Sequence, residues 1–96
     1  MQPVASAVII GVGPEQGLGA ALARHFSAKG LHVFIAGRSE DKLQMVAATI
    51  RRSGGKVSPV VTDATVEADV EHLFYTVKRE NMPIDIAVYN VDSNIP

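Results

Sequence analysis

The amino-acid sequence predicts a doubly wound α/β fold built on a parallel sheet. Three observations lead to this expectation: four short apolar runs, three segments with helical periodicity, and strict alternation of the two kinds. Short continuous apolar runs are typical of strands buried on both faces of a parallel sheet. Because the connections are short, we expect right-handed crossovers in the order βαβαβαβ, with helices on both faces of the sheet.

The first strand and helix are expected on either side of a glycine-rich stretch. Residues 4–10 form an apolar, β-branched run that ends at Gly11, and we interpret it as a buried strand. From Gly17 to Gly30 apolar side chains recur every four residues, which indicates a helix. Its apolar stripe consists of Leu18, Leu22 and Phe26.

The second strand and helix follow directly. Residues 32–36 form a second apolar run, and Ser39 is placed to cap a helix whose first turn carries Glu40 and Asp41. The helix is expected to end at Gly54 and Gly55. Its apolar stripe consists of Leu43, Val46, Ala47 and Ile50, and we also assign Met45 to the core.

The last three elements repeat the pattern. Residues 56–62 are expected to form the third strand, Thr65 to cap the third helix, and residues 81–83 to end it. Residues 84–89 are expected to form the fourth strand. The third helix has an apolar stripe of Val66, Val70, Leu73, Phe74 and Val77.

This order places the first strand near the middle of the sheet and the fourth strand beside it. We expect residues 1–96 to form one Rossmann-like unit that is truncated before further strands. The fourth strand would then lie at an unprotected edge, which predicts self-association and a homo-oligomer.

Composition excludes several classes of function. The net charge of -1 provides no overall basic field to attract nucleic acid or an anionic membrane. The chain has no cysteine, and its three histidines are too far apart to form a metal site. The first apolar run is too short to span a membrane. We therefore expect a cytoplasmic protein without a metal ion.

A glycine-rich loop lies between the first strand and the first helix. Gly13, Gly17 and Gly19 have the spacing G-x-x-x-G-x-G, whereas G-x-G-x-x-G fails at Gln16. Such glycines allow a tight turn, close approach of a pyrophosphate, and packing of the helix on the sheet. The helix N-terminus then favours the phosphates. The alternative is that these glycines are ordinary turn residues.

The end of the second strand predicts which dinucleotide is bound. An NAD site usually has an acidic residue here, but this sequence has Arg38 followed by Ser39. An arginine can bind the 2′-phosphate of NADP through charge-assisted hydrogen bonds. We therefore expect NADP rather than NAD, the alternative being that Arg38 is a solvated loop residue.

These features together resemble the short-chain dehydrogenase/reductase family. Asp63 matches the aspartate that contacts adenine in that family, although it could also simply cap the turn before Thr65. Asn90 aligns with the central asparagine of the Asn-Asn-Ala-Gly motif. The resemblance implies cofactor contacts from Gly13, Gly17, Leu18, Gly19, Arg38, Ser39, Asp63, Ala64 and Asn90.

The sequence also departs from the family's pattern. Val12 replaces a usual threonine, and Asp92 lies in the Asn-Asn-Ala-Gly region. The family's catalytic Tyr-x-x-x-Lys pair is absent, because Tyr75 is followed four residues later by Arg79 and Tyr89 by Ser93. We therefore predict a cofactor-binding part of an oxidoreductase without catalytic residues, with a non-catalytic nucleotide-binding module or a self-associating fragment as alternatives.

Overall fold

The computed structural model describes residues 5–14 and 16–90, and it confirms the predicted alternation of strands and helices. Residue 4 of the expected first strand, Asp92 and Ser93 lie outside the described residues. The elements are β1 (Ser6–Ile10), α1 (Leu18–Ala28), β2 (His32–Gly37), α2 (Glu40–Arg52), β3 (Val57–Val61), α3 (Glu67–Arg79) and β4 (Ile84–Tyr89).

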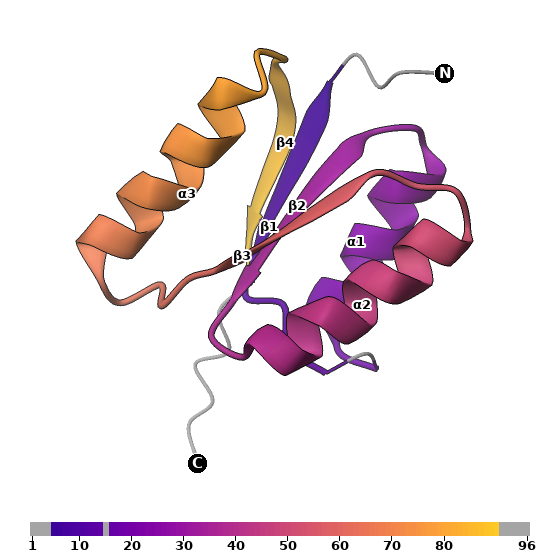
Figure 1. Cartoon of the computed structure of the whole chain (residues 1–96), viewed down its shortest axis with the longest axis horizontal. Coiled ribbons are helices and arrows are strands. Elements are labelled where there is room, and N and C mark those ends of the chain that lie inside the picture. The colour runs from indigo at the N-terminus through magenta and orange to yellow at the C-terminus, as the bar shows by residue number, and fades with distance from the viewer. Residues whose placement is uncertain (1–4, 15, 91–96) are drawn as a thin grey trace.

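The four strands form one parallel sheet in the order β3-β2-β1-β4. The first strand is central and the fourth lies beside it, as predicted. Figure 1 shows α1 and α2 on one face of this sheet and α3 on the other, so the three-layer arrangement is confirmed. Because all strands run in the same direction, their carboxyl ends lie together at one edge of the molecule.

Two apolar cores hold the layers together. The core under α1 and α2 includes Ile9 and Ile35 from the sheet, with Leu43 and Val46 from α2. The core under α3 is smaller, and only Leu73 and Val77 of this helix are fully buried. The sheet is therefore covered more thinly on its α3 face.

Four predictions about the helices are wrong in detail. Val66 is 41% exposed and is the N-cap of α3, so it does not belong to the apolar stripe of that helix. Thr65 does not cap α3, because the N-cap is Val66 and the Thr65 hydroxyl donates instead to Asp63. Met45 is 58% exposed rather than part of the core. Leu18 is also exposed, because α1 packs on the sheet through its small residues Gly19, Ala20 and Ala23.

The helix ends follow the chemistry of their sequences. The Ser39 hydroxyl accepts a hydrogen bond of 3.3 Å from the Lys42 N–H, which confirms the predicted cap of α2. After α3 the backbone turns at Asn81, whose φ of 61° lies in the left-handed region that asparagine tolerates. That turn reverses the chain into β4.

Candidate functional site

A hollow of about 430 Å³ lies at the carboxyl edge of the sheet. It is lined by residues 10–13, 37–39 and 62–65, together with Lys42 and Asn90. These segments follow the ends of all four strands. The structure therefore brings together six of the predicted site residues: Gly13, Arg38, Ser39, Asp63, Ala64 and Asn90. Gly17, Leu18 and Gly19 lie in the adjoining loop and helix and do not line the hollow.

The glycine loop is fastened to the end of β2. The carbonyl oxygen of Ala36 accepts hydrogen bonds from the N–H groups of both Gly11 and Val12, each 2.8 Å long. Gly11 has a φ of 102°, a conformation that favours glycine. The chain thus leaves β1 by a turn that other residue types would strain.

The three predicted glycines have different surroundings. At Gly13 an added Cβ atom would meet nothing within 4 Å, so this backbone is open to a ligand. Gly17 donates to the Pro14 carbonyl oxygen at 2.8 Å and closes the loop ahead of α1. At Gly19 a Cβ would lie 2.7 Å from the Gly11 carbonyl oxygen, so the helix can approach the loop only without a side chain.

Gly37 lines the hollow, and the sequence analysis assigned it no role. A Cβ at this residue would collide with the carbonyl oxygen of Val12, which is backbone and cannot move aside. The signal in the sequence was a glycine at the end of the second apolar run, directly before Arg38. Its role is to let the end of β2 and the glycine loop lie in contact.

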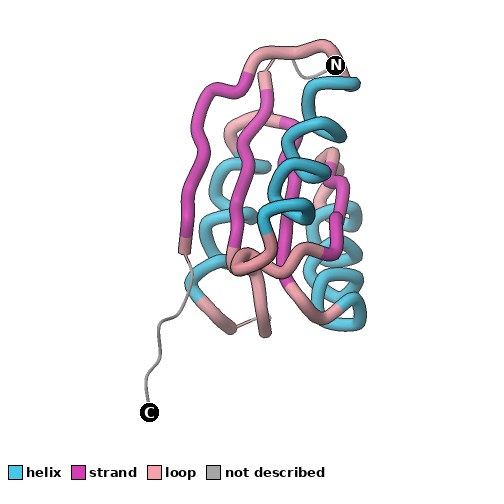
Figure 2. The backbone as a smooth tube through the Cα atoms, turned by 90° about the vertical axis from the view of Figure 1, so that its left-hand side faces the viewer, coloured by secondary structure: helices cyan, strands magenta, loops and turns pink. Residues whose placement is uncertain are grey.

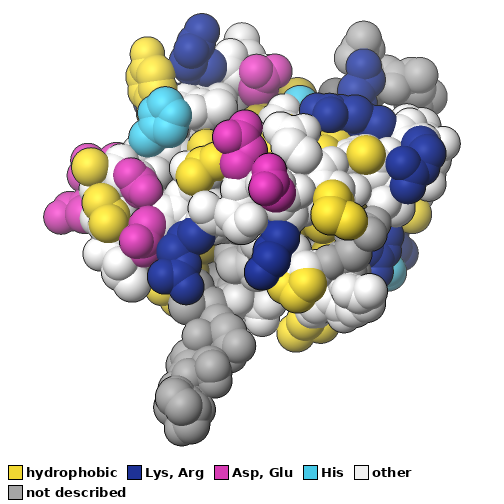
Figure 3. All heavy atoms as spheres, turned by 60° about the horizontal axis from the view of Figure 1, so that its bottom comes forward, with side chains coloured by type: hydrophobic (Ala, Val, Ile, Leu, Met, Phe, Trp, Pro, Cys, Tyr) yellow, Lys and Arg dark blue, Asp and Glu magenta, His cyan; other side chains and the backbone are white. Residues whose placement is uncertain are grey.

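One side of the hollow is basic. Arg38 is exposed at the end of β2, and Lys42 follows in the first turn of α2. The Ser39 hydroxyl is already engaged as the cap of α2. Figure 3 brings this end of the molecule forward and shows Lys and Arg side chains beside Asp and Glu side chains, with apolar side chains between them. The charge around the hollow is therefore mixed.

Asp63 is held in a turn after β3. Its carboxylate accepts hydrogen bonds from the Thr65 hydroxyl at 2.7 Å and from the Thr65 N–H at 2.9 Å. These two bonds lower the pKa of Asp63. Desolvation opposes them, and the charge of Arg38, the weakest of the four effects, lowers the pKa further. The Asp63 N–H in turn donates to the Asp69 carboxylate at 2.8 Å. Asp63 therefore organises the turn, which is the simpler of its two predicted roles, and its carboxylate stays ionised.

The far side of the hollow is closed by the end of β4. The Asn90 N–H donates to the Ile10 carbonyl oxygen at 2.7 Å, which fixes this residue beside the first turn of the glycine loop. Asn90 is half-buried. Asn90 therefore lies beside the glycine loop, and its contact with a cofactor stays a prediction.

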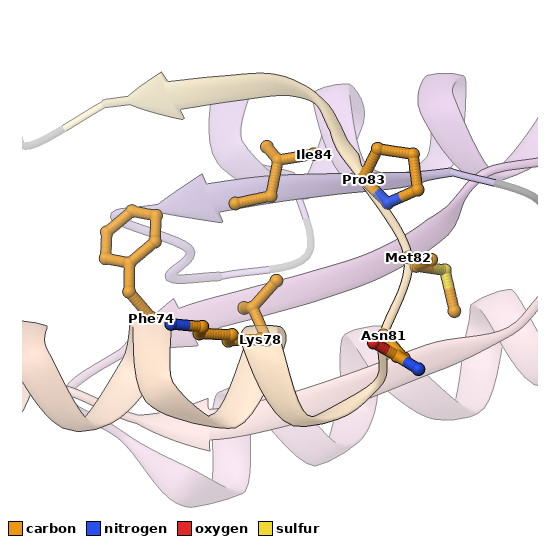
Figure 4. A pocket seen from close by; sticks show the side chains of 7 residues that line it. Phe74, Lys78, Asn81, Met82, Pro83 and Ile84 are labelled. Carbon is orange, nitrogen blue, oxygen red and sulfur yellow. The ribbon is translucent and has the colours of Figure 1, made fainter.

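Among residues 5–14 and 16–90, no group of three or more His, Asp or Glu side chains is placed to hold a metal ion. Within the same residues no helix is long and apolar enough to cross a membrane. A second hollow of about 520 Å³ lies between the end of α3 and the start of β4 (Figure 4).

A hollow at the carboxyl edge of a doubly wound sheet, beside a glycine-rich turn, is the arrangement of dinucleotide-binding α/β proteins. The short chain dehydrogenase family model matches residues 7–94. The chain therefore belongs to the short-chain dehydrogenase/reductase family.

Individual relatives agree with this assignment. The chain is 33% identical over 94 residues to dehydrogenase/reductase SDR family member 1 of Homo sapiens, covering 97% of this chain and 30% of that protein. A short-chain dehydrogenase from Rhodopseudomonas palustris superposes with a TM-score of 0.85 at 30% identity, covering 95% of this chain and 42% of that one.

A third comparison includes a bound cofactor. L-sorbose reductase from Gluconobacter frateurii, solved with NADPH and L-sorbose, has a TM-score of 0.86 at 26% identity. The match covers 98% of this chain and 35% of that one. The chain thus spans about a third of the length of the relatives it matches.

Proposed function

We propose that this chain is the cofactor-binding part of an NADP(H)-dependent oxidoreductase. In a complete protein it would serve hydride transfer between the nicotinamide and a carbonyl or alcohol substrate. The observation that carries the proposal is the position of Arg38, which lines the same hollow as Gly13 at the end of β2. NAD-binding sites usually have an acidic residue there, and it would repel a 2′-phosphate.

The residues around the hollow fit a dinucleotide. The open backbone at Gly13 leaves room for a diphosphate, and a glycine turn leading into a helix favours negative charge. Arg38 and Lys42 would bind the 2′-phosphate. Asp63 and Ala64 would lie along the adenine, and Asn90 along the ribose edge. A volume of about 430 Å³ lies within the usual range of small-molecule sites.

The remaining predicted contacts are part of the same proposal. Gly17, Leu18 and Gly19 would act through the shape of the loop and the start of α1, with the exposed Leu18 side chain available to the cofactor. When bound, the nicotinamide supplies the hydride chemistry. The bound NADPH of L-sorbose reductase, which shares this fold, supports the choice of a nicotinamide dinucleotide.

The experiment that tests the proposal is calorimetric titration of the purified chain with NADPH and, separately, with NADH. We expect binding of NADPH at least tenfold tighter, because each charge-assisted hydrogen bond contributes about 1.5–3 kcal/mol and about 1.4 kcal/mol is a factor of ten. Arg38→Asp should abolish this preference. Lys29→Asp, the same change of charge in the exposed loop after α1, should leave it intact.

Two results would contradict the proposal. Equal affinity for NADPH and NADH would contradict the proposed binding of the 2′-phosphate by Arg38. An Arg38→Asp variant that still prefers NADPH would contradict it as well. If the folded chain binds neither nucleotide, the glycine loop is only a structural turn.

The chain itself carries no Tyr-x-x-x-Lys pair. We therefore expect it to bind NADPH without oxidising it in the presence of carbonyl compounds, which favours the non-catalytic nucleotide-binding alternative for the 96 residues alone. Absorbance at the reduced nicotinamide band checks this. Steady NADPH oxidation by a purified chain would contradict it. A cytoplasmic location remains a prediction.

A further inference from the structure

The turn between β3 and α3 forms one wall of the hollow, and its first residue is tied to the sheet. Residues 62–65 line the hollow. The Thr62 N–H donates to the Gly37 carbonyl oxygen at 2.7 Å, and the buried Thr62 hydroxyl donates to the Val60 carbonyl oxygen at 2.9 Å. The turn therefore leaves the sheet from a fixed point.

The polar groups of Asp63 are divided between the turn and α3. Its carbonyl oxygen accepts a hydrogen bond of 2.9 Å from the Val66 N–H, and its Oδ1 accepts the two hydrogen bonds from Thr65. Its N–H donates to Oδ2 of Asp69 at 2.8 Å. Within the part of the chain that the structure describes, no donor is bonded to the second carboxylate oxygen of Asp63. That oxygen is left for a ligand.

Asp69 links this turn to α3. It is the third residue of the helix after the N-cap Val66, whose own side chain caps nothing. An acidic residue at this position usually accepts the N–H of the N-cap residue. Here the Val66 N–H is bonded to Asp63 already, and the Asp69 carboxylate accepts the Asp63 N–H instead. Because the acceptor is charged, this bond is stronger than the neutral bonds of the turn.

The helix holds Asp69 in place. Leu73 lies one turn further along the same side of α3 and is fully buried against the sheet. Asp69 is half-buried, whereas Glu67 in the same first turn is exposed. Figure 2 shows α3 in front of the sheet, with its first turn at the end of the molecule where the strands lead into the loops of the hollow. A carboxylate on a packed helix thus contacts the wall of the hollow from behind.

We propose that Asp69 is a positioning residue for the cofactor, and that it sets the adenine side of the site through the backbone of Asp63. The inference rests on the proposed function, in which Asp63 lies along the adenine. Asp69 itself does not line the hollow. Its hydrogen bond fixes the peptide group between Thr62 and Asp63, and this peptide group determines where the Asp63 carboxylate lies.

The chemistry of the carboxylate defines which atom of the base it can bind. An ionised carboxylate accepts hydrogen bonds and donates none. The donor on the adenine base is its 6-amino group. The free oxygen of Asp63 can accept a hydrogen bond from that group when the turn holds it in place. Hypoxanthine carries an oxygen at the same position, which repels a carboxylate. The chain should therefore distinguish the two bases, and the degree of selectivity should depend on Asp69.

The alternative is that Asp69 only stabilises the helix. Acidic residues in a first turn interact favourably with the helix dipole, and Glu67 provides a second one in α3. Such a role changes the free energy of unfolding but has no means of telling one base from another. Base selectivity is therefore the measurement that separates the two roles.

Calorimetric titration of the purified chain with NADPH and with reduced nicotinamide hypoxanthine dinucleotide phosphate tests the proposal. We expect the unaltered chain to bind NADPH about tenfold more tightly than the hypoxanthine analogue. Asp69→Ala should lose most of this selectivity, by weakening the binding of NADPH while leaving that of the analogue nearly unchanged. Asp69→Asn keeps an oxygen that can accept the Asp63 N–H, so it should retain much of the selectivity. Glu67→Ala, which removes an exposed carboxylate from the same turn, is the matched control and should behave like the unaltered chain.

Amide hydrogen exchange measures the same bond without any nucleotide. The Asp63 N–H should exchange about tenfold faster in Asp69→Ala than in the unaltered chain, and slowly in Asp69→Asn. The Thr62 N–H, which is bonded to Gly37, should stay protected in all variants. Protection at Thr62 shows that the end of the sheet remains folded when Asp69 is changed.

Three results would overturn the proposal: base selectivity unchanged in Asp69→Ala, equal losses of selectivity in Asp69→Ala and Glu67→Ala, or exchange at Asp63 that does not respond to Asp69→Ala. The ratio of NADPH to NADH affinity tests the proposed function separately, because it depends on Arg38. Asp69→Ala should keep that ratio while it loses base selectivity, and this combination supports the positioning role. A folded chain that binds neither nucleotide would refute the proposed function and, with it, the adenine contact.

Discussion

Gly37 lies directly against the carbonyl oxygen of Val12, and this contact joins the end of β2 to the glycine loop. We predict that Gly37→Ala destabilises the chain by about 1–3 kcal/mol, the usual cost of overpacking, because backbone must move to admit the methyl group. Urea denaturation measures the free energy of unfolding. Gly13→Ala is the matched control, since its methyl group would enter open space.

Comparing Gly13→Ala with Gly37→Ala distinguishes an effect on NADPH binding from an effect on folding stability. Gly13→Ala should keep the free energy of unfolding within about 0.5 kcal/mol while weakening NADPH binding, because its methyl group stands where the diphosphate approaches. If Gly37→Ala unfolds no more easily than Gly13→Ala, the contact with Val12 is not a constraint on the fold.

The hydroxyl of Thr65 is the main cause of the lowered pKa of Asp63. We predict that Thr65→Val raises this pKa toward its ordinary value, whereas Thr65→Ser keeps it low. An NMR titration of the Asp63 carboxyl carbon measures the difference. Because the folded pKa lies below the unfolded value, the stabilisation is present above about pH 3.8 and is lost as the pH falls through the folded pKa. An unchanged pKa in Thr65→Val would refute the role of the hydroxyl.

His32 gives the chain a second dependence on pH. Burial lowers the pKa of this imidazole below 6.5, opposed by the charge of Glu80 and assisted by that of Lys56. The ring stacks on Phe34 with centroids 4.4 Å apart, and its Nε2 lies 2.8 Å from the Ser58 hydroxyl oxygen. The neutral form therefore belongs to the folded state.

Stability should accordingly be complete above about pH 6.5 and decline as the pH falls through the lower folded pKa. His32→Gln cannot take up this proton, so its melting temperature should vary less between pH 7 and pH 5. His72→Gln, on the exposed surface of α3, is the control and should retain the dependence of the unaltered chain. Identical pH profiles for all three proteins would contradict the prediction.

Because few residues of α3 are buried against the sheet, the stability of this layer should depend strongly on Leu73. Leu73 is fully buried and, with Val77, provides the fully buried contacts of α3 with the sheet. Leu73→Ala should cost about 2–5 kcal/mol, a large share of the stability of a small domain. Tyr75→Ala on the same helix, 61% exposed, should cost less than about 0.5 kcal/mol. Urea denaturation compares the two, and equal costs would contradict the buried role of Leu73.

Much of the fold could be predicted because periodicity reports burial. The apolar runs identified β1 and β2, and the stripe of Leu43, Val46, Ala47 and Ile50 identified the buried face of α2. The prediction of buried residues failed where a large apolar side chain is exposed and where small side chains are buried. Met45 is large and apolar yet exposed, whereas the fully buried residues of α1 are small and its larger Leu22 and Phe26 are only partly buried.

The candidate site could be predicted to the extent that its residues follow strand ends. Arg38, Asp63 and Asn90 come together because parallel strands end at one edge. The close approach of Gly37 to Val12 could not be predicted, since it depends on the distance between two loops far apart in the sequence. The role of Thr65 was missed for a different reason. A threonine hydroxyl can cap a helix or donate a hydrogen bond to a neighbouring carboxylate, and here it donates to Asp63.

Pro59 bears on how large an assembly can become. Sheets that are open on both sides can add molecules indefinitely and grow into fibres. In this chain Pro59 lies in β3, at one border of the described sheet, and it lacks the N–H that a further strand would need there. The β3 side of the sheet is therefore a poor template for the growth of a fibre.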